Sequence, residues 1–275
     1  MPDLFFGDNS SMTAMVAASI SRTARSLARR APPPPAEPAL PVDVSEVIPE
    51  DVRRWASMAD QEAEQCVWRL LQRGMTAEEV CLDVLTAAAR RLGALWVEDR
   101  CTFVDVTLAV TRFQNITHRL GPHFSSVAEP GCRGRALVGA VPGEQHTFGL
   151  SMVAEFLKRD GWDVVLADAS RDTAAFVAPL ADTWFDVVAI SAANDRAEKG
   201  LTRLLSSIRR RGQNHKVRAI IGGRLVQDRD GLVRRVGADG WAENARAAVE
   251  LARSLGEAEP RERSRREKVR LHGTS

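Results

Sequence analysis

The segment GEQHTFGL, residues 143–150, combines the residue types best suited to binding a metal ion. His146 is one of only five histidines in the chain, and Glu144 lies two residues before it. A metal-binding imidazole usually donates its other ring N–H to a carboxylate, and Glu144 is close enough in sequence to accept that bond. Gly149 has no side chain to obstruct a bulky ligand. Metal ligation, base catalysis and a purely structural imidazole are all open at this point.

This loop directly follows the apolar run RALVGAVP, which is typical of a buried strand. After residue 135, short β-branched runs alternate with helical stretches, and each run is apolar on both faces. The pattern predicts a doubly wound, flavodoxin-like parallel sheet, an α/β fold. In such sheets ligands bind outside the carboxyl ends of the strands, which is where His146 falls. The predicted strands are RALVGAV, WDVVLAD, FDVVAIS, VRAIIGG and a weak last one at ADGW.

Helical periodicity dominates the N-terminal half. Thr76 with Glu79 and Thr102 with Asp105 have the spacing of capping boxes in front of apolar helical runs. About four helices joined by short loops are expected, as in a four-helix bundle. The predicted organisation is a flexible Pro-rich tail at 1–45, a helical bundle at 46–124, a linker at 125–134, the sheet domain at 135–257 and a charged basic tail at 258–275.

The composition excludes several classes of function. The 275 residues are 44% hydrophobic, and 38 basic against 36 acidic residues give a net charge of +2, so nothing drives the whole chain toward polyanions. Only RERSRREKVR, at 261–270, suggests a weak DNA contact, with a solvated helical extension as the alternative. No apolar run approaches the ~20 residues that span a bilayer. We therefore expect a cytoplasmic protein that makes no membrane contact.

Two later positions bear on the histidine loop. Ser191 follows the third predicted strand in AISAAND, and Gly222-Gly223 closes the fourth in IIGGRL. Glu-x-His-x-x-Gly, then Ser, then Gly-Gly resembles the cobalamin-binding domain, whose pattern is Asp-x-His-x-x-Gly, Ser-x-Leu and Gly-Gly. The resemblance implies that His146 is the lower cobalt ligand and that the nucleotide tail lies beside Ser191 and the two glycines. The remaining positions it assigns are Thr147 and Phe148 in the loop, Glu144 in place of Asp, and Ala193 in place of Leu.

The helical half strengthens the resemblance. Cobalamin-binding domains of methyltransferases and light-sensing repressors carry a four-helix cap with a tryptophan over the corrin, within LGxxWxE. Here the text is LGALWVEDRCTFVDVT, with Trp96 in that position. Where the light-sensing relatives have Glu-His, this chain has Val106-Thr107, so that upper histidine is missing. His118 and His123 are candidate substitutes, and solvated or capping roles are the alternative.

Taken over residues 46–255, the chain resembles the PpaA/AerR group of bacterial regulators, with WVEDRCTFVDV as the most specific match. The resemblance implies a cobalamin cofactor, in hydroxo/aquo or adenosyl form, and a non-enzymatic antirepressor that contacts a PpsR/CrtJ-type repressor of photosynthesis genes. A response to light follows from the photolabile cobalt–carbon bond.

Three other interpretations stay open. A corrinoid protein that carries methyl groups for a methyltransferase would use the same pocket. A haem sensor would use the histidine for iron. In a ligand-free signalling domain, Ser191 would cap a helix and Gly222-Gly223 would form a tight turn.

Overall fold

The computed structural model describes residues 52–124, 128–129, 131–144, 147–168, 172–193, 197–227 and 231–257. The chain forms two compact units that divide after Leu120, a helical unit and a sheet unit. Both predicted tails lie outside the described residues. No helix in the described part of the chain is long and apolar enough to cross a membrane.

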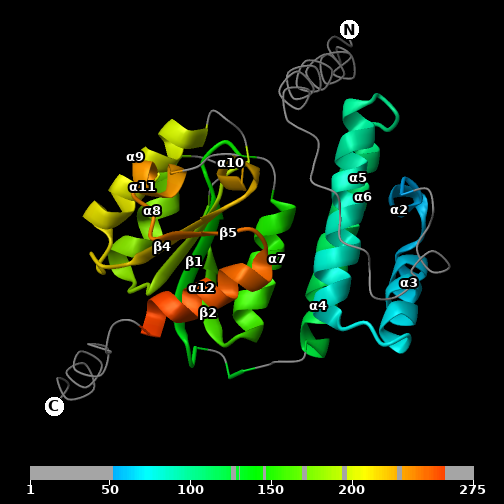
Figure 1. The fold of residues 1–275 in the computed structure, drawn as a ribbon, viewed down its shortest axis with the longest axis horizontal. Coiled ribbons are helices and arrows are strands. Elements are labelled where there is room, and N and C mark those ends of the chain that lie inside the picture. Colours follow the sequence, from blue (N-terminus) through cyan, green and yellow to red (C-terminus); the bar gives the residue numbers. More distant parts are fainter. Residues whose placement is uncertain are drawn as a thin grey trace, which may run out of the picture. The chain divides into compact units, whose positions relative to one another are not determined.

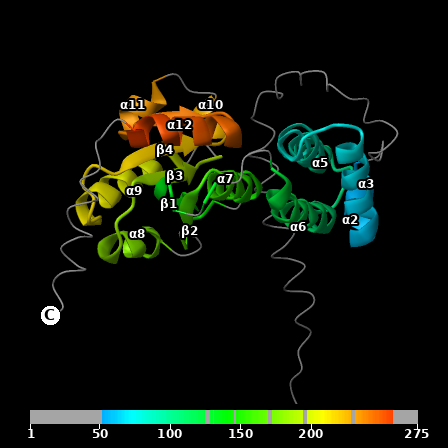
Figure 2. The same ribbon diagram turned by 90° about the horizontal axis from the view of Figure 1, so that it is seen from below.

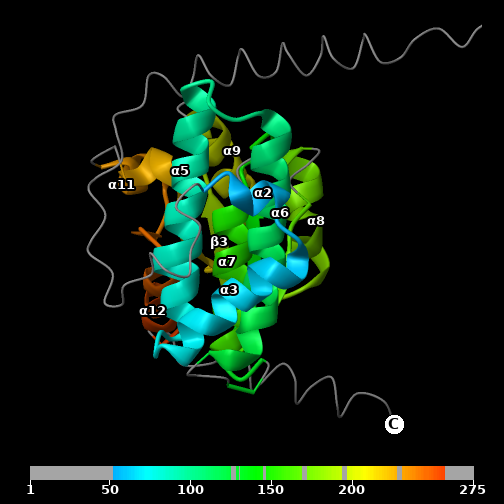
Figure 3. The same cartoon turned by 90° about the vertical axis from the view of Figure 1, so that its right-hand side faces the viewer.

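The helical unit contains the predicted set of about four helical segments (Figures 1 and 3). The third segment is continuous through three elements and includes a turn of π-helix that the sequence did not predict. The segments are α2 (Arg54–Ser57), α3 (Asp60–Gln72), α4 (Ala77–Glu79) with η1 (Val80–Leu85) and α5 (Thr86–Val97), and α6 (Phe103–Leu120).

Both predicted capping boxes are present at helix starts. The Thr76 N–H donates to Glu79 Oε2 at 2.8 Å, and the Glu79 N–H donates to Thr76 Oγ1 at 3.2 Å. The Thr102 N–H donates to Asp105 Oδ2 at 2.8 Å, and the Asp105 N–H returns a bond to Thr102 Oγ1 at 3.1 Å. Each box satisfies backbone donors that a helix start leaves unpaired, so these four side chains determine where α4 and α6 begin.

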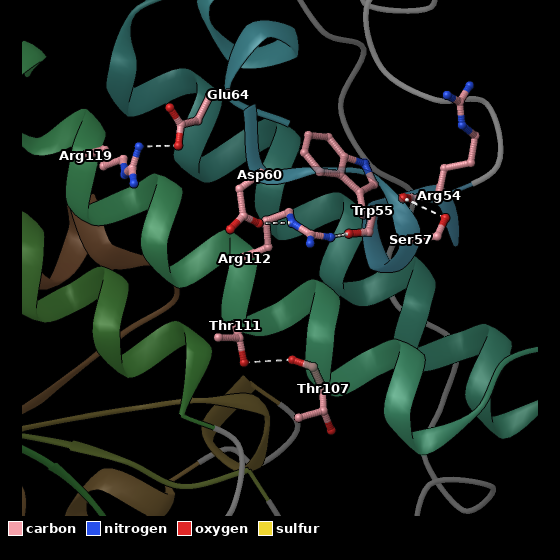
Figure 4. Close-up of polar contacts among 9 residues, drawn as sticks. All are labelled: Arg54, Trp55, Ser57, Asp60, Glu64, Thr107, Thr111, Arg112 and Arg119. Atoms are coloured by element: carbon pink, nitrogen blue, oxygen red, sulfur yellow. Dashed lines mark hydrogen bonds and ion pairs between the residues drawn. The ribbon is translucent and has the colours of Figure 1, made fainter. Parts of the chain in front are cut away.

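The core of the helical unit is held by an aromatic pair and one arginine. The fully buried rings of Trp55 and Phe113 meet edge to face, with centroids 5.2 Å apart. Arg112 reaches from α6 to donate through Nε to Asp60 at 2.8 Å and through Nη1 to the carbonyl oxygen of Trp55, and Arg119 pairs with Glu64 (Figure 4). These contacts fix α6 against α2 and α3.

The sheet unit contains five parallel strands in the order β2-β1-β3-β4-β5, which is the predicted flavodoxin-like order. The order reverses between β1 and β3, so the carboxyl ends of these two strands form the topological switch point. The strands are β1 (Gly134–Ala140), β2 (Trp162–Leu166), β3 (Val187–Ser191), β4 (Arg218–Gly222) and β5 (Gly240–Ala242).

Helices cover both faces of this sheet (Figures 1 and 2). One face packs against α8 (Thr173–Asp182), α9 (Ala197–Arg211) and α11 (Leu232–Val236), whose buried apolar residues form one cluster with the strands. The other face packs against α7 (Phe148–Arg159) and α12 (Ala245–Glu257), which also contact each other. The short α10 (Arg224–Gln227) follows β4.

The division between the units lies four residues before the predicted boundary at 124. Residues Gly121–His123 form a turn of 3-10 helix, η2, that contacts α7. The rings of Phe124 and Phe156 then meet edge to face at 4.7 Å. Because Phe124 packs on a helix of the sheet unit, residues 121–124 belong to that unit and not to the bundle.

Candidate functional site

The carboxyl edge of the sheet presents a row of small residues. The register pairs Ala140 with Ser191, Ser191 with Gly222, and Gly222 with Ala242. The row therefore crosses four neighbouring strands, and no side chain in it is larger than a hydroxymethyl group. A flat ring can approach the backbone here more closely than at any row of branched side chains, and the Ser191 hydroxyl adds one donor and acceptor.

Backbone contacts explain why glycine follows this row. Gly223 has a φ of +98°, and a Cβ placed on it would overlap the backbone oxygen of Ala192. The Ala192 N–H donates to Gly222 O at 2.9 Å, and the Leu225 N–H donates to Ala192 O at 3.2 Å. The loop after β3 thus lies directly against the loop after β4. Of the predicted Gly-Gly pair, Gly223 is needed both for its left-handed backbone and for this close approach.

Glu144 joins the first loop to the same edge. Its N–H donates to Val141 O at 2.9 Å, which closes a turn after β1, and its Oε2 accepts the Ala193 N–H at 3.0 Å. The bond connects the loops on either side of the topological switch point, 49 residues apart in sequence. A carboxylate offers about four lone-pair positions, so this bond leaves it able to accept another. The predicted bond from His146 stays a prediction, because His146 lies outside the described residues.

The start of α7 is the other described part of the histidine loop. Thr147 is exposed and precedes the helix, Phe148 is half-buried, and Gly149 is exposed. Apart from its chain neighbours and its own helix, no described residue places a heavy atom within 4 Å of the position that a Cβ on Gly149 would take. The structure thus brings Glu144, Ser191, Ala193 and the two glycines to one edge of the sheet, with α7 beginning beside the first loop.

In the helical unit, Trp96 lies near the end of α5. Its indole nitrogen is buried and has no hydrogen-bond partner among the described residues. In α6, the Thr107 hydroxyl donates to Phe103 O at 2.8 Å and the Thr111 hydroxyl donates to Thr107 O at 2.9 Å, so both hydroxyls are used within the helix (Figure 4). Neither Val106 nor Thr107 has a side-chain nitrogen, so neither can act as an upper nitrogen ligand of a corrinoid.

The role of His118 as a substitute upper ligand stays a prediction, and His118 lies far along α6 from Trp96. Trp96 adjoins the turn between α5 and α6, whereas His118 lies in the last turn of α6. The fifteen residues from Phe103 to His118 extend over about 22 Å of helix. His123 lies in η2, which belongs to the sheet unit.

Sequence reasoning missed two features of these regions. Ala140 and Ala242 complete the row of small residues, and only the strand register reveals them. On α6, Phe103, Val104 and Leu108 are 50%, 60% and 49% exposed. Their apolar character was visible in the sequence, but the helical periodicity that predicted α6 gave no reason to place them on its surface.

Comparison with known proteins identifies the sheet unit. The family model "B12 binding domain" matches residues 134–250, from the first residue of β1 into α12. A Rhodobacter capsulatus protein described as an uncharacterized 20.5 kDa protein in the bchF-crtJ intergenic region is 36% identical over 169 residues, covering 59% of this chain and 84% of that protein. The chain belongs to the B12-binding domain family.

Other similar proteins are named as corrinoid proteins. Dimethylamine corrinoid protein 3 of Methanosarcina acetivorans is 26% identical over 180 residues, which cover 65% of this chain and 82% of that protein. The solved structure of the Methanosarcina barkeri monomethylamine corrinoid protein superposes with a TM-score of 0.60 at 16% identity, covering 76% of this chain and 98% of that one. The latter likeness establishes the fold, a helical cap followed by a Rossmann-like B12-binding domain.

The residues at the carboxyl edge fit cobalamin, which is the cofactor of this family. The in-register row of small residues gives a flat base access to the backbone, and Ser191 can bond a ring nitrogen. The substitution of Ala193 for leucine keeps its backbone N–H, which Glu144 binds. The two residues that differ from the family pattern, Glu144 and Ala193, are thus joined by one hydrogen bond.

Proposed function

We propose that this cobalamin-binding chain is a non-enzymatic regulator, an antirepressor that contacts a PpsR/CrtJ-type repressor. The observation that carries the proposal is the 36% identity to a protein encoded between bchF and crtJ, over 84% of that protein's length. One flanking gene shares its name with the repressor type that the sequence resemblance implies. The identity to the corrinoid carrier proteins is lower, at 23% to 28%.

In this proposal His146 is the lower cobalt ligand and Glu144 orients it. Ser191, Ala193, Gly222 and Gly223 hold the nucleotide tail, Thr147, Phe148 and Gly149 border the corrin, and Trp96 contacts its upper face. When bound, cobalamin supplies an axial position at which one group can replace another, and a cobalt–carbon bond that light can break. The chain itself positions the macrocycle. It also converts a conformational change in the loop after β1 into a conformational change at its surface.

The bond between Glu144 and Ala193 gives this conversion a physical route. Any shift of the first loop that moves the Glu144 carboxylate strains or breaks its 3.0 Å bond to the Ala193 N–H. Ala192, the preceding residue, is bonded to Gly222 and Leu225. A displacement at the histidine loop is therefore passed through two further loops of the sheet unit.

A second function is favoured by a different observation. Several relatives that match at 76% to 87% of their own length are named as corrinoid proteins for dimethylamine or trimethylamine, or as a corrinoid protein without a stated amine. The second candidate is therefore a corrinoid protein that carries methyl groups for a methyltransferase. It shares the cofactor and the sheet edge with the regulator, so the two differ only in the partner and in what is done to the cofactor.

Cobalamin retention tests the site. Purified protein is mixed with hydroxocobalamin, adenosylcobalamin or haemin, passed through gel filtration in the dark, and recorded as an absorption spectrum before and after illumination. We expect retention of at least one cobalamin and its loss in His146→Ala. His215→Ala is the control, since His215 is an exposed histidine whose ring bonds the Arg209 carbonyl. Retention of haem in place of cobalamin, or unchanged retention in His146→Ala, contradicts the proposed ligation.

A partner assay separates the two functions. The cobalamin-loaded protein is mixed with a CrtJ-type repressor, and release of the repressor from its operator is followed by mobility shift in dark and light. The same loaded protein is reduced and offered methylamines together with a methylamine:corrinoid methyltransferase. Operator release without methylation supports the regulator, and methylation without operator release supports the carrier.

A further inference from the structure

The exposed side of α9 carries a stripe of cations. Lys199, Arg203 and Arg210 are separated by four and seven residues, so they lie within about 40° of one another around the helix. All three are exposed, whereas Leu201, Leu204, Leu205 and Ile208 on the opposite side are buried in the sheet unit's core. Arg234 is also exposed, on α11, which contacts α9 (Figure 1). We call Lys199, Arg203, Arg210 and Arg234 the basic face.

Two described carboxylates near the basic face, Glu198 and Asp239, are already paired. Glu198 accepts a bond from Arg235 at 3.2 Å, and Asp239 accepts bonds from Arg209 at 3.2 Å and Arg218 at 3.4 Å. None of the four residues of the basic face forms an ion pair with any described residue. The face thus keeps its positive charge although the whole chain has a net charge of only +2.

The other exposed residues of α9 leave the stripe chemically simple. Thr202 donates its hydroxyl to Glu198 O at 3.0 Å and Ser206 donates its hydroxyl to Thr202 O at 2.9 Å, so both are used within the helix. The large exposed hydrophobic residues of the described chain lie on other elements, and none is on α9 or α11. Protein interfaces depend on aromatic and apolar anchors, whereas contacts to nucleic-acid phosphates depend on exposed arginine and lysine.

From these observations we infer that the basic face of α9 and α11 binds the phosphate backbone of double-stranded DNA without reading its sequence. The stripe from Lys199 to Arg210 extends over about 16 Å of helix, and duplex DNA carries one negative charge per ~1.7 Å of its axis. Several phosphates therefore lie within reach of the stripe. The inference does not depend on the proposed function.

Fluorescence anisotropy with a labelled duplex of mixed sequence tests the inference, on the full chain and at several NaCl concentrations. The variant Lys199→Gln/Arg203→Gln/Arg210→Gln is expected to bind on the order of a hundredfold more weakly at 0.1 M salt, with a salt slope shallower by about 3, because three phosphate contacts are lost. The reduction is expected to be the same for duplexes of unrelated sequence.

The matched control neutralises three exposed arginines elsewhere, in Arg69→Gln/Arg90→Gln/Arg246→Gln. It makes the same change in net charge and is expected to bind DNA like the wild type, and circular dichroism checks that both variants stay folded. Equal binding by the α9 variant and the control overturns the inference. So does a wild-type protein that binds an acidic peptide such as polyglutamate, or vesicles of anionic lipid, as strongly as DNA.

Discussion

The two halves of the predicted site differ in how strongly the backbone restricts their residues. One half is the carboxyl edge of the sheet unit, and the other is the hairpin of α5 and α6 in the helical unit. At the sheet edge, three loops are bonded to one another through Ala192, Ala193 and Glu144, and Gly223 touches backbone where any side chain would lie. On the hairpin, Phe103, Val104 and Leu108 project from α6 with large exposed fractions. The sheet edge therefore accepts few residue types, whereas the face of α6 can change without disturbing the fold.

This difference suggests a division of labour. An edge with close backbone contacts is suited to holding a cofactor in one geometry, and an open helix face is suited to varying what lies above it. Of the two residues at the Glu-His position of the resemblance, Thr107 is on this exposed face and Val106 is half-buried. Each of the following predictions measures one side of this comparison.

The largest effect is expected at Gly223. Gly223→Ala combines an unfavourable left-handed backbone with overlap against Ala192 O, and we expect it to lower the free energy of unfolding by more than ~3 kcal/mol, from strain of ~1–2 kcal/mol plus the overlap. Gly237→Ala is the control, because Gly237 has a φ of +81° with no atom near a Cβ, and it should lose only the backbone part. Urea unfolding measures both, and equal losses would show that the edge is not tightly packed.

The next prediction concerns the hydrogen bond between the loop after β1 and the loop after β3. Glu144→Ala removes the acceptor for the Ala193 N–H, and a hydrogen bond to a charged group contributes about 1.5–3 kcal/mol. Glu144→Gln keeps an acceptor oxygen without the charge and should recover part of the loss. If Glu144→Ala unfolds at the same urea concentration as the wild type, the bond does not support the edge, and the proposed route between loops fails.

Most of the fold could be predicted, because it depends on local pattern. Apolar runs gave the five strands, and the Thr76 and Thr102 boxes gave two helix starts within a residue. The π-helix Val80–Leu85 could not be predicted in this way. Its apolar residues still recur at nearly helical spacing, and one feature that accompanies it, the bond from the Thr86 hydroxyl to Cys81 O at 3.1 Å, becomes visible only in the structure.

The candidate site was predictable in its residues but less so in its contacts. Glu144, Ser191 and the glycines follow strands and so had to meet at one edge. The bond from Ala193 to Glu144 joins residues 49 positions apart and depends on loop geometry, and the place of Ala140 in the row depends on strand register. Neither quantity is encoded in a local pattern.

Trp96 tests the hairpin side of the comparison. Its indole N–H is buried without a partner among the described residues, so Trp96→Phe removes an unsatisfied donor along with some apolar surface. We expect the free energy of unfolding to change by less than ~1 kcal/mol. Trp55→Phe is the matched control, because Trp55 has the same unpartnered nitrogen but is fully buried against Phe113, and a cavity there should cost ~1–3 kcal/mol. Chemical denaturation of the two variants shows whether Trp96 is packed as tightly as Trp55. A larger loss of unfolding free energy in Trp96→Phe than in Trp55→Phe would contradict an open hairpin.

The effect that depends on pH is expected at the start of α6. The backbone N–H of Thr102, and then its hydroxyl, hold the pKa of the Asp105 carboxyl below its usual value near 3.8. Because the pKa is lowered on folding, the cap stabilises the protein above that usual value and is lost as the pH falls through the folded-state pKa. Thr102→Ala should therefore lose about 1 kcal/mol at pH 7, and its difference from the wild type should shrink below about pH 4.

The control for this cap is Thr111→Ala, whose hydroxyl bonds the Thr107 carbonyl and has no carboxylate partner among the described residues. Its effect on unfolding should stay constant between pH 7 and pH 3, as followed by thermal unfolding at each pH. A parallel pH dependence in the two variants would mean that the Thr102–Asp105 box does not control the helix start. The position of α6 would then depend on its other contacts, which include the bonds of Arg112, the ion pair of Arg119 with Glu64 and the aromatic pair.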